Sequence, residues 1–231
     1  MGRPKLKPRQ AAQLSLVESV PQKWSPPPPL KPLTRAQGLL LSSLRTNTLS
    51  FAVGAAGTGK TMVATAHAAD LLRDNRIEKI ILTRPIVEAG EALGFLPGNV
   101  SEKVLPYILP VRNIFYERLG ASFTDYCFKS GKIEVVPLAH MRGHSFHDCF
   151  VLFDEAQNAT PKQMLLFLSR IGERGRVAVT GDTAQSDIRN LNGLSDAIAR
   201  LQDLASVGIV TFTRDDVVRS DFCRKVLERY E

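Results

Sequence analysis

Gly54-Ala55-Ala56-Gly57-Thr58-Gly59-Lys60-Thr61 is the stretch that decides the fold of this 231-residue chain. It fits the phosphate-loop pattern GxxxxGK(S/T) completely. An apolar segment, residues 49–53, comes directly before it, and a segment of helical composition, residues 60–73, follows. Glycines allow the backbone to wrap closely around a phosphate, with amide groups pointing inward at the start of a helix. The flanking segments favour a P-loop over a chance glycine-rich turn.

The last two residues of the stretch bring a positive charge and a hydroxyl group. We expect Lys60 to contact the β- and γ-phosphates of ATP, and the Thr61 hydroxyl to bind Mg²⁺. The backbone of Gly54–Thr61 then holds the phosphates. The sequence therefore predicts ATP and Mg²⁺ as the ligands of this chain.

A second element, residues 150–155, is an apolar strand that ends in two acidic residues. A buried carboxylate needs a partner at this place, and Mg²⁺ supplies one. We expect Asp154 to hold the metal through its water shell and Glu155 to orient and deprotonate the attacking water. Taken alone, such an acidic pair is more often a helix cap or a surface turn, but the P-loop favours a metal site.

A third polar turn, residues 180–185, again follows an apolar strand. The carboxyl ends of parallel strands open on the same crevice, so this turn should face the same ligand. Gln185 is placed to sense the γ-phosphate or to hold the attacking water. An ordinary Gly-Asp turn is the alternative.

Short apolar segments alternate with helical segments along the chain. The predicted strands cover residues 49–53, 79–83, 133–136, 149–153, 176–180 and 208–212. The predicted helices cover residues 60–73, 102–119, 161–171, 191–204 and 221–230. Consecutive apolar residues are typical of strands buried on both faces of a parallel sheet. The pattern predicts an α/β fold with three layers around a mainly parallel sheet.

The first 32 residues differ in composition from the rest. They contain eight of the 14 prolines, and their six Lys or Arg residues against one Glu give +5 of the net charge of +7. Such a segment favours polyproline conformation and builds no packed core. We predict a disordered basic arm over residues 1–32 and one folded domain over residues 33–231. The arm is either a contact to nucleic acid or a solvated tail.

The sequence contains no apolar run long enough to cross a bilayer, and its first residues lack the apolar centre of a signal peptide. We therefore expect a cytoplasmic protein that has no membrane partner. The cysteines Cys127, Cys149 and Cys223 are odd in number and scattered, which argues against a disulfide framework or a zinc site. Reduced, buried thiols are the expected state.

Two motifs that follow the P-loop make a family resemblance specific. The sequences Asp-Glu-Ala-Gln-Asn at 154–158 and Gly-Asp-Thr-Ala-Gln at 181–185 resemble the PhoH family, relatives of the first RecA-like domain of superfamily 1 helicases. Further segments are similar to that family: 83–85, 89–91, 94–98, 106–110, 141–143, 167–172 and 216–219. The resemblance covers nearly everything from Leu33 onward. It implies a RecA-like P-loop NTPase that hydrolyses ATP, binds single-stranded RNA or DNA and forms a hexameric ring.

The resemblance also implies roles for residues outside these motifs. Gln37 matches a glutamine that reads the adenine edge in related helicases, and a surface glutamine opening a helix is the equal alternative. Arg219 is similar to an arginine offered to the γ-phosphate of a neighbouring subunit, with Arg170 as the competing candidate. Because the chain has one nucleotide-binding domain, completion of the site by a neighbour is the economical arrangement.

The chain departs from the family pattern at two places. His144 stands where a second arginine is usual, so a contact to nucleic acid or to a neighbouring subunit would be weaker and pH-dependent there. Ser220 stands where family members commonly have a histidine.

Three other functions remain open at this point. The chain could be a ring-shaped motor that translocates on a single strand, an RNA-processing nuclease or its partner, or a nucleotide sensor without hydrolysis. Glu155 argues against the sensor, because binding alone needs no base beside the metal. The lack of a second acidic cluster in the sequence argues against the nuclease, because two-metal hydrolysis needs several acidic ligands together.

Overall fold

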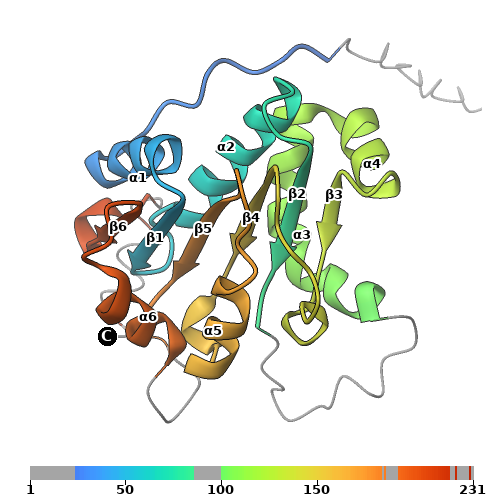
Figure 1. The fold of residues 1–231 in the computed structure, drawn as a ribbon. Helices are drawn as coiled ribbons and strands as arrows, with labels where there is room; N and C mark the ends of the chain where they lie inside the picture. The colour runs from blue at the N-terminus through green and yellow to red at the C-terminus, as the bar shows by residue number, and fades with distance from the viewer. Residues whose placement is uncertain are drawn as a thin grey trace, which may run out of the picture.

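A single parallel sheet forms the centre of the protein (Figure 1). The computed structural model describes residues 24–85, 100–183, 185, 192–218, 222 and 229. Within them the strand order is β3-β2-β4-β5-β1-β6, and every strand pair is parallel. The strands are β1 (Leu49–Gly54), β2 (Lys79–Thr83), β3 (Ile133–Val135), β4 (Cys149–Phe153), β5 (Arg176–Gly181) and β6 (Val207–Phe212).

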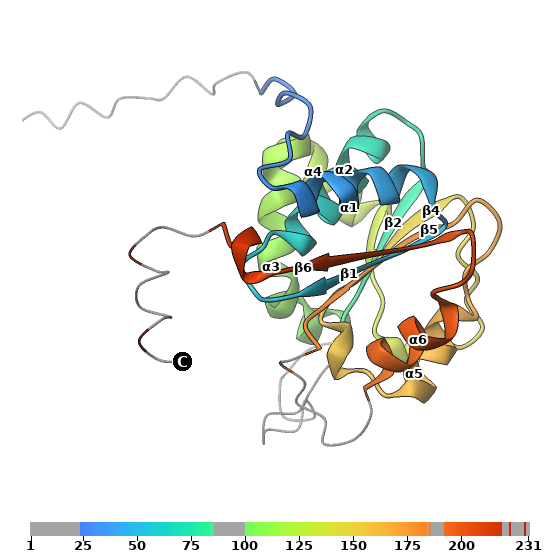
Figure 2. The ribbon, with the colours of Figure 1, turned by 90° about the vertical axis from the view of Figure 1, so that its left-hand side faces the viewer.

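Helices cover both faces of this sheet (Figure 2). One face carries α1 (Arg35–Thr46), α2 (Lys60–Arg73), α3 (Val100–Leu119) and α4 (Ala121–Lys129). The other carries α5 (Pro161–Leu168) and α6 (Gly193–Leu201). Short 3-10 turns add η2 (Leu138–His140), η3 (Ala156–Asn158) and η4 (Arg214–Asp216). The predicted three-layer α/β fold with a parallel sheet is confirmed.

All six predicted strands are present, each with bounds within one residue of the prediction. The predicted helix at 161–171 ends earlier, at Leu168, because Ile171 pairs with Phe146 in a parallel bridge. Two helices were not predicted: α1, whose sequence is interrupted by Gly38 and two serines, and the short α4. The predicted helix at 221–230 lies outside the described residues, apart from Phe222 and Arg229, as do the family-like segments 89–91 and 94–98.

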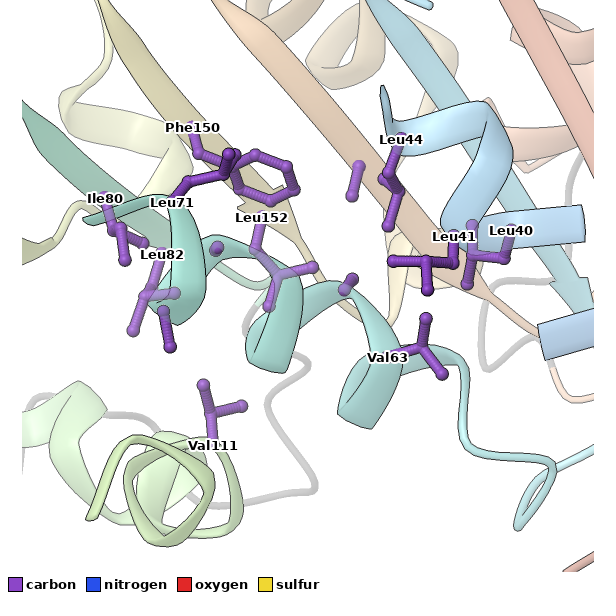
Figure 3. Packing of buried hydrophobic residues seen from close by; sticks show 14 of the residues in the cluster. Leu40, Leu41, Leu44, Val63, Leu71, Ile80, Leu82, Val111, Phe150 and Leu152 are labelled. Carbon is purple, nitrogen blue, oxygen red and sulfur yellow. The ribbon is translucent and has the colours of Figure 1, made fainter. Parts of the chain in front are cut away.

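The hydrophobic core lies between the sheet and the helices on each face. On the α2 face, Leu71 of α2 lies near the apolar side chains of β2 and β4, and Val63 of the same helix lies near the leucines of α1 (Figure 3). On the other face, Phe153 and Phe167 contact each other edge to face, with ring centroids 4.7 Å apart. Burial on both faces explains why the strands read as continuous apolar runs. This rigid sheet fixes where the loops at its carboxyl edge lie.

Residues 24–32, which belong to the predicted arm, contact the folded domain. The Arg118 guanidinium donates to the carbonyl oxygen of Pro28 (2.9 Å) and forms an ion pair with Asp70 (2.6 Å). The Trp24 ring lies against Gly120, where an added Cβ would come within 2.9 Å of it. Of the predicted arm, residues 24–32 thus lie on the domain. Its other residues, 1–23, lie outside the described residues.

The thiols of Cys127 and Cys149 are free and buried, and burial raises the pKa of Cys149 to about 11. Cys223 lies outside the described residues. None of the helices in the described part of the chain combines the length and hydropathy that crossing a membrane requires.

His67 makes the stability of the fold pH-dependent. Its imidazole is buried on α2 and contacts Phe150 edge to face; burial lowers its pKa to about 4. In the unfolded chain His67 has a pKa near 6.5, so as the pH falls it binds a proton before the folded protein does. The contribution of His67 to the free energy of unfolding is therefore full above pH 6.5 and is lost as the pH drops toward 4. We expect His67 to cost about 2 kcal/mol of unfolding free energy between pH 7 and 5.

Urea unfolding of wild type and His67→Leu at both pH values measures this cost. The variant should lose less stability on acidification than wild type, whereas His140→Leu, the same change at an exposed position, should behave as wild type. An equal loss in wild type and His67→Leu contradicts the prediction.

Candidate nucleotide-binding site

The P-loop connects β1 to α2 in a conformation that its glycines allow. Gly54, Gly57 and Gly59 have φ angles of 139°, 79° and 86°, values that residues with a Cβ rarely adopt. At Gly54 the chain also passes too close to β6 for a side chain, since an added Cβ would meet the Phe212 carbonyl oxygen at 2.0 Å. The loop shape is therefore encoded by glycine and fixed by β6.

The Lys60 ammonium lies inside the loop. It donates to the carbonyl oxygens of Gly54 (2.6 Å) and Ala55 (2.7 Å) and to the Thr58 hydroxyl (3.3 Å). Burial lowers the pKa of Lys60, while the carboxylates of Asp182, Glu155 and Asp154 raise it. A positive charge is thus held where three carboxylates converge.

Thr61 and Asp154 meet although 93 positions separate them. The Thr61 hydroxyl donates to Asp154 Oδ1 at 2.7 Å, and the Thr180 hydroxyl donates to the same oxygen at 2.5 Å. This is possible because β5 lies between β1 and β4, which places Thr180 next to both neighbours. The predicted metal residues Thr61 and Asp154 are side by side.

Glu155 follows Asp154 in a left-handed conformation, with φ 53°. A non-glycine residue held there costs on the order of 1 kcal/mol, and such strain is concentrated at functional sites. Among the described residues its carboxylate contacts Arg84 at 3.6 Å through one oxygen and accepts from the Gln157 amide at 2.6 Å through the other. These contacts hold the Glu155 carboxylate in a defined orientation.

These residues line one cavity of about 260 Å³ at the carboxyl edge of the sheet. Its wall contains P-loop residues, both acids of the β4 end and the turn after β5, and also Gln185. The lining residues are Ala56, Gly57, Gly59, Lys60, Thr61, Met62, Asp154, Glu155, Gly181, Asp182 and Gln185. The three sequence motifs therefore meet around one space.

Gln37 is fully buried against the P-loop. Its amide donates to the Thr58 carbonyl oxygen (3.0 Å), and its carbonyl accepts the Leu33 N–H (2.9 Å). An added Cβ on Gly59 would come within 2.7 Å of the Gln37 amide nitrogen. Gln37 thus holds the loop through its hydrogen bond to Thr58. It is not a surface residue, which was the alternative interpretation. Recognition of adenine by Gln37 stays a prediction.

Arg84 and the two predicted candidates, Arg170 and Arg219, lie in different places. Arg84, which follows β2, lies 3.6 Å from the carboxylate of Glu155, a residue that lines the cavity. Arg170 follows α5, and its carbonyl oxygen accepts the N–H of Phe146, close to where β4 begins, so it lies at the opposite edge of the sheet. Arg219 lies outside the described residues, but the Val218 N–H donates to the Gly57 carbonyl oxygen of the P-loop at 3.0 Å. His144 is exposed, and Ser220 lies outside the described residues.

Sequence reasoning missed Thr180 and Gln157 as site residues. Thr180 is the first residue of the turn at 180–185, but its contact with Asp154 joins positions 26 residues apart, and no local pattern indicates it. Gln157 is part of the Asp-Glu-Ala-Gln motif, but no local pattern indicates which groups its amide joins.

Comparisons with known proteins agree with this geometry. A family model described as PhoH-like protein matches residues 29–231. The chain is 44% identical to Protein PhoH of Escherichia coli K12 over 206 residues, which are 87% of this chain and 58% of that protein. It is 42% identical to a PhoH-like protein of Bacillus subtilis 168 over 200 residues, 86% of this chain and 63% of that protein. The chain thus spans less than two thirds of these relatives.

Solved structures show the same fold in more distant proteins. The large terminase of a thermophilic bacteriophage, in complex with ADP, superposes with a TM-score of 0.54 at 13% identity, over 86% of this chain and 50% of that one. Another crystal form of the same terminase gives 0.53, also at 13% identity, over 87% and 51%. The fold is that of a P-loop NTPase, and the chain belongs to the PhoH family.

Proposed function

We propose that this chain binds and hydrolyses Mg·ATP and couples hydrolysis to single-stranded RNA or DNA. The observation that carries the proposal is the meeting of three motifs on one cavity: Lys60 and Thr61 from the P-loop, Asp154 and Glu155 after β4, and Gln185 after β5. A binding protein without hydrolysis needs no oriented carboxylate such as Glu155 beside its phosphate site.

The residues of the cavity fit Mg²⁺. A hydroxyl oxygen of Thr61 and a carboxylate oxygen of Asp154 lie 2.7 Å apart on its wall. Mg²⁺ in nucleotide sites takes oxygen ligands, usually one or two carboxylates together with phosphates and waters. In the described ranges no group of three or more His, Cys, Asp or Glu side chains could hold a metal ion, so phosphates and waters have to complete the shell. When bound, the metal neutralises charge on the phosphates.

The chain's own residues divide the work of hydrolysis. The P-loop amides and the Lys60 ammonium hold the triphosphate, replacing the carbonyl and hydroxyl oxygens that Lys60 contacts otherwise. Glu155 accepts the proton of the attacking water, and Gln185 orients that water or senses the γ-phosphate. Gln37 positions the loop and, through its remaining hydrogen-bonding capacity, reads the adenine edge.

We also propose a hexameric ring in which Arg219 completes the site of a neighbouring subunit. A ring formed by head-to-tail contacts is a closed assembly that reuses one interface. Arg84 is the competing arginine, because it already contacts Glu155 of its own chain at 3.6 Å.

Phosphate release by the purified protein tests the proposal. We expect Mg²⁺-dependent turnover of ATP that increases when single-stranded RNA or DNA is added, and no cleavage of a labelled strand. Turnover unaffected by either strand contradicts the coupling. Strand cleavage at the same site would favour a nuclease, and ATP binding without turnover would favour a sensor.

The basic arm provides a separate prediction. Deleting residues 1–23 keeps Trp24 on Gly120 and removes five basic residues and one Glu, Arg3, Lys5, Lys7, Arg9, Lys23 and Glu18. If the arm contacts phosphates, the truncated protein should bind single-stranded nucleic acid more weakly and with a smaller salt dependence, while ATP affinity stays unchanged. Fluorescence anisotropy over a salt series measures this. An unchanged slope shows that the arm is only solvated.

A further inference from the structure

Gln157 joins the ends of two neighbouring strands. It belongs to η3, directly after β4, and its side chain is buried, with 3% exposure. Its amide nitrogen donates to Glu155 Oε2 at 2.6 Å, and its carbonyl oxygen accepts the N–H of Asp182 at 3.0 Å. One planar carboxamide thus connects the candidate base after β4 to the turn after β5.

The connection continues toward the second candidate for water positioning. The Asp182 carbonyl oxygen accepts the N–H of Gln185 at 3.1 Å. Three hydrogen bonds, joined by the Gln157 carboxamide and by the backbone of Asp182, therefore lead from the Glu155 carboxylate to the backbone N–H of Gln185. Glu155 and Gln185 line the same cavity.

Gly181 leaves room for this carboxamide. An added Cβ at that position would come within 2.7 Å of Gln157 Oε1 and within 2.6 Å of Leu194 Cδ2. The φ angle of Gly181 is not in the left-handed region, so steric space is the reason for glycine here. The fold keeps the end of β5 free of a side chain at the point where Gln157 crosses it.

The carboxylate of Glu155 depends on this bond for its orientation. Its side chain is 38% exposed, and its other oxygen contacts Arg84 at the longer distance of 3.6 Å. A bond of 2.6 Å from a buried amide restrains it more strongly than a half-exposed ion pair. A general base must lie within hydrogen-bond reach of the water that it deprotonates. A group that sets the orientation of the base therefore affects the rate of hydrolysis.

We propose that Gln157 is a positioning residue of the hydrolytic step: it sets the Glu155 carboxylate and ties it to the turn that carries Gln185. The proposal rests on the proposed ATP hydrolysis. In this proposal Gln157 neither accepts a proton nor holds a phosphate, and it acts through its hydrogen bond to Glu155. Its loss should lower kcat and leave the affinity for ATP nearly unchanged, because the phosphates are held by the P-loop.

Three variants separate the two bonds of the carboxamide. Gln157→Met keeps the size of the side chain and removes both bonds. Gln157→Glu keeps an acceptor for the Asp182 N–H but loses the donor to Glu155. Gln157→His can donate from one ring nitrogen and accept on the other, as the amide does. Gln202→Met is the matched control, because in the described part of the chain that exposed side-chain amide donates only to the Ala199 carbonyl oxygen, at 3.4 Å.

The readouts are kcat and KM for ATP, the affinity for a non-hydrolysable ATP analogue, and the thermal unfolding transition. We expect kcat to fall by about tenfold to a hundredfold in the Met and Glu variants, with analogue affinity within about twofold of wild type. The His variant should regain part of the lost kcat. The control should match wild type in every readout.

Other results overturn the proposal. Wild-type kcat in folded Gln157→Glu shows that the bond to Glu155 does not position it. A loss of analogue affinity as large as the loss of kcat, equal in the Met, Glu and His variants, shows a purely structural role. If Gln157→Met fails to fold, the Glu and His variants, which keep the bond to Asp182, decide between the same outcomes. Absence of turnover in the wild type itself would instead refute the proposed function.

Discussion

Glu155→Gln is expected to abolish turnover while ATP binding persists. The change keeps the size of the side chain and removes the oxygen that accepts the proton of the attacking water. General bases contribute about 10²- to 10⁴-fold to rate, so kcat should fall by at least about a hundredfold. Phosphate release under saturating Mg·ATP measures this loss, and binding of a fluorescent ATP analogue measures the affinity.

Lys60→Ala is the comparison that separates chemistry from binding. The ammonium of Lys60 lies inside the P-loop, so its removal should weaken ATP binding as well as turnover. Gln163→Glu is the control, because it exchanges the same two side chains in the opposite direction at the exposed capping box of α5. It shows the effect of a changed carboxylate away from the site. Substantial turnover by Glu155→Gln removes Glu155 from the mechanism, and Arg84 then contacts a carboxylate without a catalytic role.

Arg219→Ala should have an effect of similar or larger size. An arginine offered to the transferring phosphoryl group contributes about 10³- to 10⁵-fold in rate in related chemistry, so kcat should fall by about a thousandfold or more. ATP affinity should change little, because the contact strengthens chiefly as charge develops in the transition state. Arg229→Ala, the same change further along the chain, is the matched control.

Mixing variants decides whose nucleotide Arg219 contacts. Arg219→Ala and Lys60→Ala subunits are each expected to be inactive. If Arg219 serves a neighbour, a mixed ring contains junctions with an intact loop and an intact arginine, and activity returns. The hydrogen bond from Val218 to Gly57 places the residue before Arg219 on the P-loop of its own chain. The alternative that the experiment tests is therefore that Arg219 acts on the nucleotide of its own chain.

Two results contradict the shared site. Mixed subunits that assemble but stay inactive indicate that Arg219 acts within its own chain or not at all. Full activity of a wild-type monomer, measured after fractionation by size, shows that no neighbour is needed. In both cases Arg84→Ala becomes the informative variant, because Arg84 lies 3.6 Å from Glu155 in the same chain.

Local sequence patterns predicted the strands and the parts of the site that lie next to one another in the chain. The P-loop, the Asp154-Glu155 pair and Gln185 each follow an apolar strand, and all three prove to line one cavity. The reason is that carboxyl ends of parallel strands share an edge. Helices α1 and α4 were missed because a weak local propensity is overridden by packing against the sheet.

The sequence by itself determined the loop conformation, through glycines at positive φ, and the order of the acidic and polar turns along the chain. Only the tertiary structure decided which side chains meet. The strand order β1-β5-β4 brings the hydroxyls of Thr61 and Thr180 to the same oxygen of Asp154, and it lets Gln157 reach Asp182 at the end of β5. These contacts depend on long-range strand pairing, and no local pattern along the chain specifies which strands become neighbours.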